Sequence, residues 1–439
     1  MLDMNPTVAA IVRKIRFSLP VLTVGLFWLV VAVANVTESL PKRMPGSLVF
    51  NDERFGTDFS GLYAAGLACV HGHWDELYDK NASPGNQMSP HFASELRRDM
   101  QTRGGEYKSA WLYPPPAALL FAPFALLDYP TALRVWTGLN GLALLILLWL
   151  VKTELHDFGL SGFWIGLLIV LLGINMPVAF NFHQQNIAVF FAIAIFAAFR
   201  GLKRGSSGTI ALAIVFLGAT KGFSVVWIPF LLLWKSWRVL LNCSIITAAW
   251  LVLTAIAGCG LENYWTFLTS IIPATRSIHS FPTPVNESIP YAFSVLFPTL
   301  TPWSMPLFSV LLLLLLAFLL FGNREIHRRM NKTEILADAD CLCLADAIIV
   351  FQMLSSLSWT FYRVHLIAIT PLFVHLCFRF RSRFFSALLL LSFVLLWLSP
   401  AKTGCIFSGT VGYATVLGLG FFAVFRLWRS RLTPRPFSL

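Results

Sequence analysis

Residues 56–79, GTDFSGLYAAGLACVHGHWDELYD, concentrate ionisable side chains in an otherwise apolar chain. The segment holds three Asp, one Glu, two His and two Tyr. A carboxylate in such a segment can serve as a general base, and His71, His73 and Asp75 are residue types that bind metals. The spacing of these three residues is unspecific, so we expect neither a metal nor another cofactor here.

The composition indicates an integral membrane protein. Of 439 residues, 57% are apolar and only 12% are charged, whereas soluble domains average about 25% charged residues. Apolar runs long enough to cross a bilayer recur along the chain, for example at 17–36 and 131–151. We therefore predict an all-α polytopic protein of the inner (plasma) membrane, with one domain over residues 1–439 and no nucleic-acid partner.

Short basic clusters predict the topology, because Lys and Arg accumulate on the cytoplasmic side of membrane proteins. The clusters are RKIR (13–16), RGLKR (200–204), KSWR (235–238), NREIHRRMNK (323–332), RFRSR (379–383) and RLWRSR (426–431). Placing all of them inside gives about twelve transmembrane segments. These are 17–36, 131–151, 161–180, 186–200, 209–219, 222–234, 238–257, 304–321, 344–358, 364–378, 383–399 and 410–426.

Two apolar stretches do not fit simple crossings. Residues 114–127 are short and contain Pro123, so we expect an interfacial helix there. Residues 209–234 lie between two basic clusters and are too short for two full spans. A shortened or re-entrant helix pair with its apex near 219–223 would place Lys221 within the membrane, where a charge is a functional-site hypothesis by default.

Two large loops are then extracytoplasmic: 37–113, with ten of the 21 acidic residues, and 258–303. In the first loop, apolar residues recur at helical spacing from Phe59 onward, which predicts an amphipathic surface helix. Asp58 stands where that helix begins. It could cap the helix and do nothing more, or it could carry chemistry.

Six segments in one order resemble the glycosyltransferase 87 family, a branch of the GT-C superfamily of membrane glycosyltransferases. They are TDFSGLYAAGLACVHGHWDELYD (57–79), YPPPAALLFAPFALL (113–127), HQQN (183–186), TKGFSVVWIPFLLLWKSWR (220–238), VNESI (285–289) and SLSWTFYR (356–363).

This resemblance implies a GT-C-like fold with surface helices in the first outer loop. It also implies transfer of a hexose, expected to be mannose, from a polyprenyl-phosphate-linked donor to a lipid or glycan acceptor. The transfer would occur on the extracytoplasmic side with inversion, and Asp58 would be the catalytic residue.

The remaining candidate site residues follow from residue type and from the matched motifs. Lys221, Arg363 and His365 are candidates for binding the donor phosphate. Those for lining the substrate cavity are Tyr63, Gln185, Asn186, Asn286 and Glu287.

The competing interpretation is a transporter or flippase for a lipid-linked or anionic substrate. Transporters usually show two related halves with paired broken helices, whereas this chain shows one broken pair and a long polar outer loop. A non-catalytic scaffold is a third interpretation.

Overall fold

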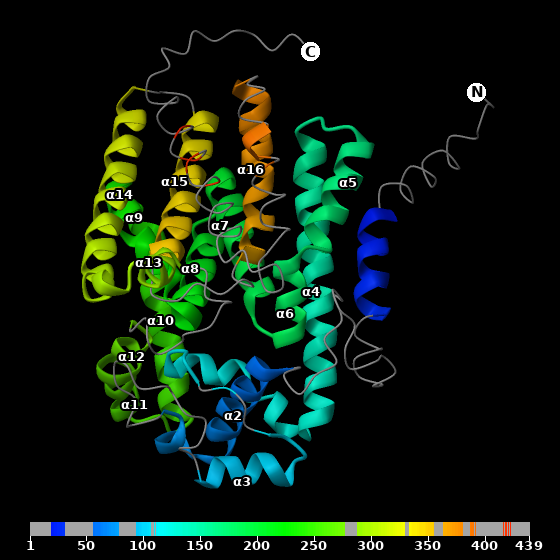
Figure 1. Cartoon of the computed structure of the whole chain (residues 1–439), viewed down its shortest axis with the longest axis vertical. Helices are drawn as coiled ribbons and strands as arrows, with labels where there is room; N and C mark the ends of the chain where they lie inside the picture. Colours follow the sequence, from blue (N-terminus) through cyan, green and yellow to red (C-terminus); the bar gives the residue numbers. More distant parts are fainter. Residues whose placement is uncertain are drawn as a thin grey trace, which may run out of the picture.

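The computed structural model describes residues 19–30, 56–78, 94–106, 109, 111–276, 288–329, 333–354, 363–380, 387–389, 391, 416, 418, 420 and 422. These residues form helices and no β-strand, as the all-α prediction requires. The longer helices run along the long axis of the molecule (Figure 1). They are α4 (Tyr129–Asp157), α5 (Gly162–Gly173), α7 (Ala188–Arg204), α8 (Ser207–Lys221), α10 (Trp237–Ile256), α14 (Thr301–Arg329), α15 (Thr333–Leu354) and α16 (His365–Phe380).

Shorter helices gather toward one end of the molecule, around α2 and α3 (Figure 1). They include α2 (Thr57–His71), α3 (Ser94–Thr102), α11 (Leu261–Thr266) and α12 (Ile272–Arg276). Two further short helices, α6 (Met176–Gln184) and α9 (Ile228–Leu233), connect longer ones, and α13 (Ile289–Leu296) precedes α14.

Three described helices are long and apolar enough to cross a membrane: Tyr129–Asp157, Trp237–Ile256 and Pro298–Arg328. A fourth span results if α5 and the helix Pro177–Gln184, which meet at a 42° bend, are counted together. The prediction of about twelve crossings is therefore not confirmed. Helices α7 and α8 are short, α15 contains several acidic residues, and most of 383–399 and 410–426 lies outside the described residues.

The α8–α9 region breaks at the predicted apex. Helix α8 ends at Lys221, and Gly222 follows in the left-handed conformation with φ of 69°. A 3₁₀ turn, η4 (Phe223–Trp227), then leads into α9. Glycine tolerates this backbone without steric cost, and the helix therefore ends here. Lys221 is its last residue, and the helix is shorter than a full membrane crossing requires.

Helix α2 differs from the predicted amphipathic helix because it is buried on almost every side, from Phe59 to Ala68. Residues 114–127 pack against it as two 3₁₀ helices, η2 (Pro115–Leu120) and η3 (Phe124–Leu126), in place of the expected interfacial α-helix. Pro123, which lies between the two 3₁₀ helices, has no amide to donate and cannot continue a regular helix from η2. The amphipathic helix of this loop is α3, which buries Leu96 and Met100.

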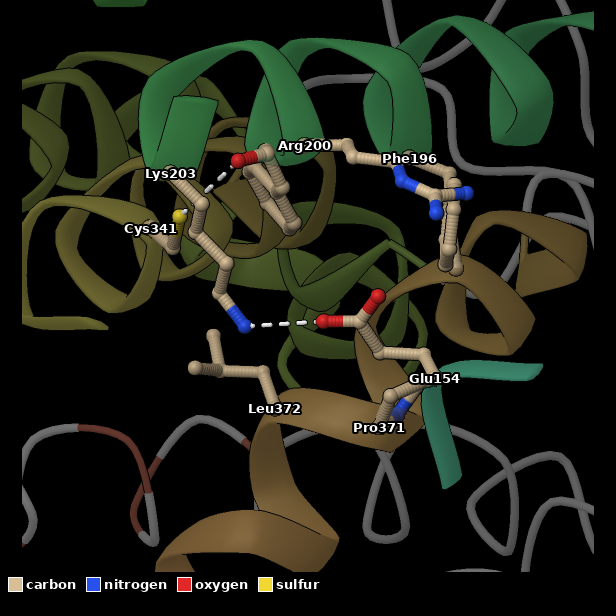
Figure 2. Close-up of a pocket in the computed structure, with 9 residues that line it drawn as sticks. Glu154, Phe196, Arg200, Lys203, Cys341, Pro371 and Leu372 are labelled. Atoms are coloured by element: carbon tan, nitrogen blue, oxygen red, sulfur yellow. Dashed lines mark hydrogen bonds and ion pairs between the residues drawn. The ribbon is translucent and has the colours of Figure 1, made fainter. Parts of the chain in front are cut away.

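Ion pairs hold the opposite end of the molecule together. Lys203 Nζ at the end of α7 lies 3.0 Å from Glu154 of α4 and 3.7 Å from Asp338 of α15. Asp338 also contacts His375 of α16 at 3.1 Å. Figure 2 shows Lys203 and Glu154 facing each other across a small pocket, with Arg200 beside it. Residues of α4, α7, α15 and α16 line this pocket, and none of α2 does.

A close contact at Gly66 fixes the position of α2. A Cβ atom there would collide with the backbone carbonyl of Phe121 in the η2–η3 segment. We predict that Gly66→Ala lowers the free energy of unfolding by roughly 1–3 kcal/mol, the usual cost of overpacking, because backbone must move. Thermal unfolding in detergent measures the effect. Gly138→Ala in α4, where a Cβ meets nothing within 4 Å, is the matched control, and equal midpoints for the two variants would contradict the prediction.

Candidate active site

Asp58 lies in the first turn of α2 and does not cap it. The N-cap is Gly56, in the left-handed conformation with φ of 72°, and this residue makes no side-chain cap. The capping role is therefore wrong for Asp58. Its Oδ2 accepts a hydrogen bond of 2.7 Å from Nδ2 of Asn186 instead.

Asn186 comes from the tight corner between α6 and α7. Helix α6 begins with Asn175, whose side chain accepts from the amide of Val178 at 3.0 Å. It ends at Gln184, and its C-cap Gln185 adopts the left-handed conformation with φ of 55°. The amide of Asn186 then donates to the carbonyl of Asn181 at 3.1 Å, which closes the corner.

The same corner binds the beginning of α2 through the backbone. The amide of Gly56 donates to the carbonyl of His183 at 2.9 Å. This backbone bond and the side-chain bond join two segments that are far apart in the sequence, since Asp58 and Asn186 are separated by 128 positions. Together they fix both the position of Asp58 and the orientation of its carboxylate.

Gln185 supports the corner from inside the core. Its side chain is fully buried, and its Nε2 donates to the carbonyl of Phe182 at 2.6 Å. Its own backbone carbonyl accepts from Nε1 of Trp136 at 2.8 Å. The structure therefore places Gln185 behind Asn186, where it holds the corner in shape.

Lys221 approaches the site from the end of α8. Its ammonium lies 4.0 Å from the centre of the Tyr113 ring, a cation–π contact. The carbonyl of Tyr113 accepts from the hydroxyl of Tyr78 at 2.7 Å, which anchors the loop carrying this ring. From sequence alone Tyr113 suggests no more than a membrane-anchoring aromatic, and only its neighbouring prolines mark the segment as unusual.

The charge of Lys221 also acts on Asp58. Burial raises the pKa of the Asp58 carboxyl above its ordinary value, while the hydrogen bond from Asn186 and the positive charge of Lys221 lower it. Burial is the largest of these effects, so the net shift of the pKa is upward. A carboxylate whose pKa is raised is a better proton acceptor than an ordinary aspartate.

The other predicted residues take different places. Tyr63 is fully buried in α2, and its hydroxyl donates to the carbonyl of Leu127 at 2.6 Å. Arg363 and His365 are buried at the beginning of α16, which packs against α4 and α7. Asn286 and Glu287 lie outside the described residues. The structure thus brings Asp58, Asn186 and Lys221 together.

Comparison with known proteins assigns the chain to a family through a stretch that begins after Asp58. No curated protein matches the chain. The sequence model of glycosyltransferase family 87 matches residues 111–344, slightly more than half of the chain. The match includes the α6–α7 corner and the end of α8, which supply Asn186 and Lys221 to the site. The chain therefore belongs to glycosyltransferase family 87, a family of membrane glycosyltransferases.

Proposed function

We propose that this protein transfers a hexose, mannose in the simplest case, from a polyprenyl-phosphate-linked donor to a hydroxyl of a lipid or glycan acceptor, with inversion. The observation that carries the proposal is the convergence of a carboxylate, an amide and an ammonium at the beginning of α2. Asp58 accepts a hydrogen bond from Asn186 and lies in the field of Lys221. Family membership supports the reaction class.

In the proposed reaction Asp58 is the general base. It removes the proton of the acceptor hydroxyl as that oxygen attacks the anomeric carbon of the sugar. The bond between the anomeric carbon and the phosphate oxygen breaks, and polyprenyl phosphate leaves with its electron pair. Attack opposite the leaving group inverts the anomeric centre.

The leaving phosphate needs positive charge more than it needs a proton. Lys221 supplies that charge as a point cation above the ring of Tyr113. Arg363 or His365, at the beginning of α16, completes the phosphate site. Tyr63 and Gln185 shape the cavity from behind, and Asn286 and Glu287 contact the acceptor.

The proposed active site faces the extracytoplasmic side of the inner membrane. The basic clusters around Arg200, Lys235 and Arg324 occupy the ends of α7, α9 and α14. Trp234 next to Lys235 bonds to Asn323, and Lys203 pairs with Asp338 in the same region. Since positive clusters mark the cytoplasmic face, the α2 end lies on the outer side.

Asp58→Asn tests the proposed base directly. The amide oxygen of the new side chain can still accept from Asn186, so we predict a folded protein with unchanged donor affinity. Turnover number (kcat) should fall by at least ~100-fold, the usual scale for loss of a general base. Release of polyprenyl phosphate from purified protein supplied with several polyprenyl-phosphate sugars gives kcat. Asp75→Asn, at an exposed position of the same loop, is the control. Near-native turnover in folded Asp58→Asn would exclude Asp58 as the base, whereas a wild-type protein that releases no polyprenyl phosphate from any of these donors would favour the transporter interpretation.

Asn186→Ala tests the electrostatics of the base. The hydrogen bond from Asn186 stabilises the charged carboxylate and lowers its pKa. Its loss should raise the pKa of Asp58, so the acidic limb of the kcat/KM profile should move to higher pH. Asn181→Ala, in the preceding helix α6, should leave the limb in place. A limb that stays where it was, or moves to lower pH, in Asn186→Ala would refute this role.

Lys221→Met tests the phosphate contact. Loss of a single cation from a phosphate site should raise the KM for the polyprenyl-phosphate donor by about tenfold or more, since a hydrogen bond to a charged group contributes about 1.5–3 kcal/mol. Lys235→Met, an exposed lysine in the next connection, should leave the donor KM unchanged. Unaltered donor kinetics in Lys221→Met would remove Lys221 from the site.

A further inference from the structure

A second group of ionisable side chains lies at the other end of α2. His71 occupies the last turn of that helix, and Gly72 then reverses the chain in the left-handed conformation with φ of 78°. His73 follows directly, so the two imidazoles flank a single glycine. Their ring centres are 6.2 Å apart and the rings are nearly perpendicular.

Helix α3 adds two carboxylates to the same place. Glu95 and Asp99 are four residues apart and therefore share one face of α3. Asp99 Oδ2 lies 2.5 Å from Nδ1 of His71 and 3.9 Å from Nε2 of His73. Glu95 Oε2 lies 3.5 Å from Nδ1 of His73. Figure 1 shows α2 and α3 adjacent at this end of the molecule, where the two helices pack.

We propose that His71, His73 and Asp99 bind a zinc ion that links α2 to α3, and that Glu95 orients His73 through the other nitrogen of its ring. One ligand atom each from His71, His73 and Asp99 lies within 4.8 Å of the others. Tetrahedral zinc sites use bonds of about 2.0–2.2 Å to nitrogen and oxygen. The side chains are partly exposed, so small rotations can bring these ligand atoms to bonding distance from one ion.

The choice of metal follows from the ligand types. Two imidazole nitrogens with carboxylate oxygens suit zinc and its neighbours in the first transition row. Calcium and magnesium prefer oxygen ligands alone. A calcium or magnesium site would therefore not use His71 and His73.

Arg103 limits how tightly the ion is held. One of its guanidinium nitrogens lies 3.3 Å from Nε2 of His71, and the other donates to the carbonyl of Ala125 at 2.8 Å. With zinc on Nδ1, Nε2 of His71 carries the proton and cannot accept a hydrogen bond. Arg103 therefore loses its contact with His71 and keeps its bond to the carbonyl of Ala125.

The proposed ion has a structural role and does not enter the sugar transfer. His71 follows Asp58 by 13 residues in α2, which at about 1.5 Å per residue places them about 20 Å apart. Zinc would instead fix the far end of the helix that carries Asp58. From the sequence, Asp75 is the carboxylate expected beside His71 and His73. Asp99 could not be identified in this way, because it reaches the site only through the packing of α3.

Zinc binding to the purified, tag-free protein in detergent tests the proposal. After chelation, titration with zinc chloride should show one tight site per chain, and zinc should raise the thermal midpoint through linkage. Cobalt in its place should give the absorption of a nitrogen- and oxygen-ligated ion. Calcium chloride should produce neither effect.

Ligand variants decide whether the zinc occupies this cluster. His73→Gln and Asp99→Asn should each lower the zinc affinity of the tight site by about 100-fold or more. Loss of a residue that only supports a ligand already lowers metal affinity by up to about 100-fold, and these two residues bind the ion directly. His156→Gln, on the exposed end of α4, should not. Absence of a tight site in the wild-type chain would overturn the proposal even if a variant failed to fold. Equal affinity in wild type, His73→Gln and Asp99→Asn would also overturn it.

Discussion

The hydrogen bond between Asn186 and Asp58 is the interaction on which the arrangement of the site depends. A carboxylate taken out of water is costly unless a donor or a charge compensates it. Asn186 supplies the donor and Lys221 the charge, and they come from the α6–α7 corner and from the end of α8. Helix α2 and the helices that follow residue 129 must therefore fold against one another before the carboxylate is stabilised.

The corner that supplies Asn186 is itself held in an uncommon conformation. Gln185 has a positive φ although it is not glycine, which costs of order 1–3 kcal/mol. The bonds from Trp136 and to Phe182 hold it in place. Such outliers persist where the surrounding structure over-determines them, and they cluster at functional sites. The corner thus presents Asn186 in one fixed orientation.

Sequence reasoning anticipates the features that depend on neighbouring residues. A lysine before a glycine in an apolar run of insufficient length marks the break at Lys221 and Gly222. Sequence reasoning fails where the structure of a segment depends on contacts with distant parts of the chain. Small residues such as Ala64, Ala65 and Gly66 let α2 be covered on both faces, and periodicity cannot show what covers them. Tyr113 beneath Lys221 and Asp99 beside His71 are likewise products of packing.

The two ends of the molecule are fastened by different kinds of interaction. The partly exposed pair Lys203–Glu154 joins α7 to α4 far from α2, whereas the beginning of α2 is held by a backbone bond and by a buried amide. Mobile ions screen exposed charges over about 8 Å at physiological ionic strength, and they act much less on buried contacts. Concentrated salt should therefore loosen the helices at the ion-pair side first, while α2 stays attached.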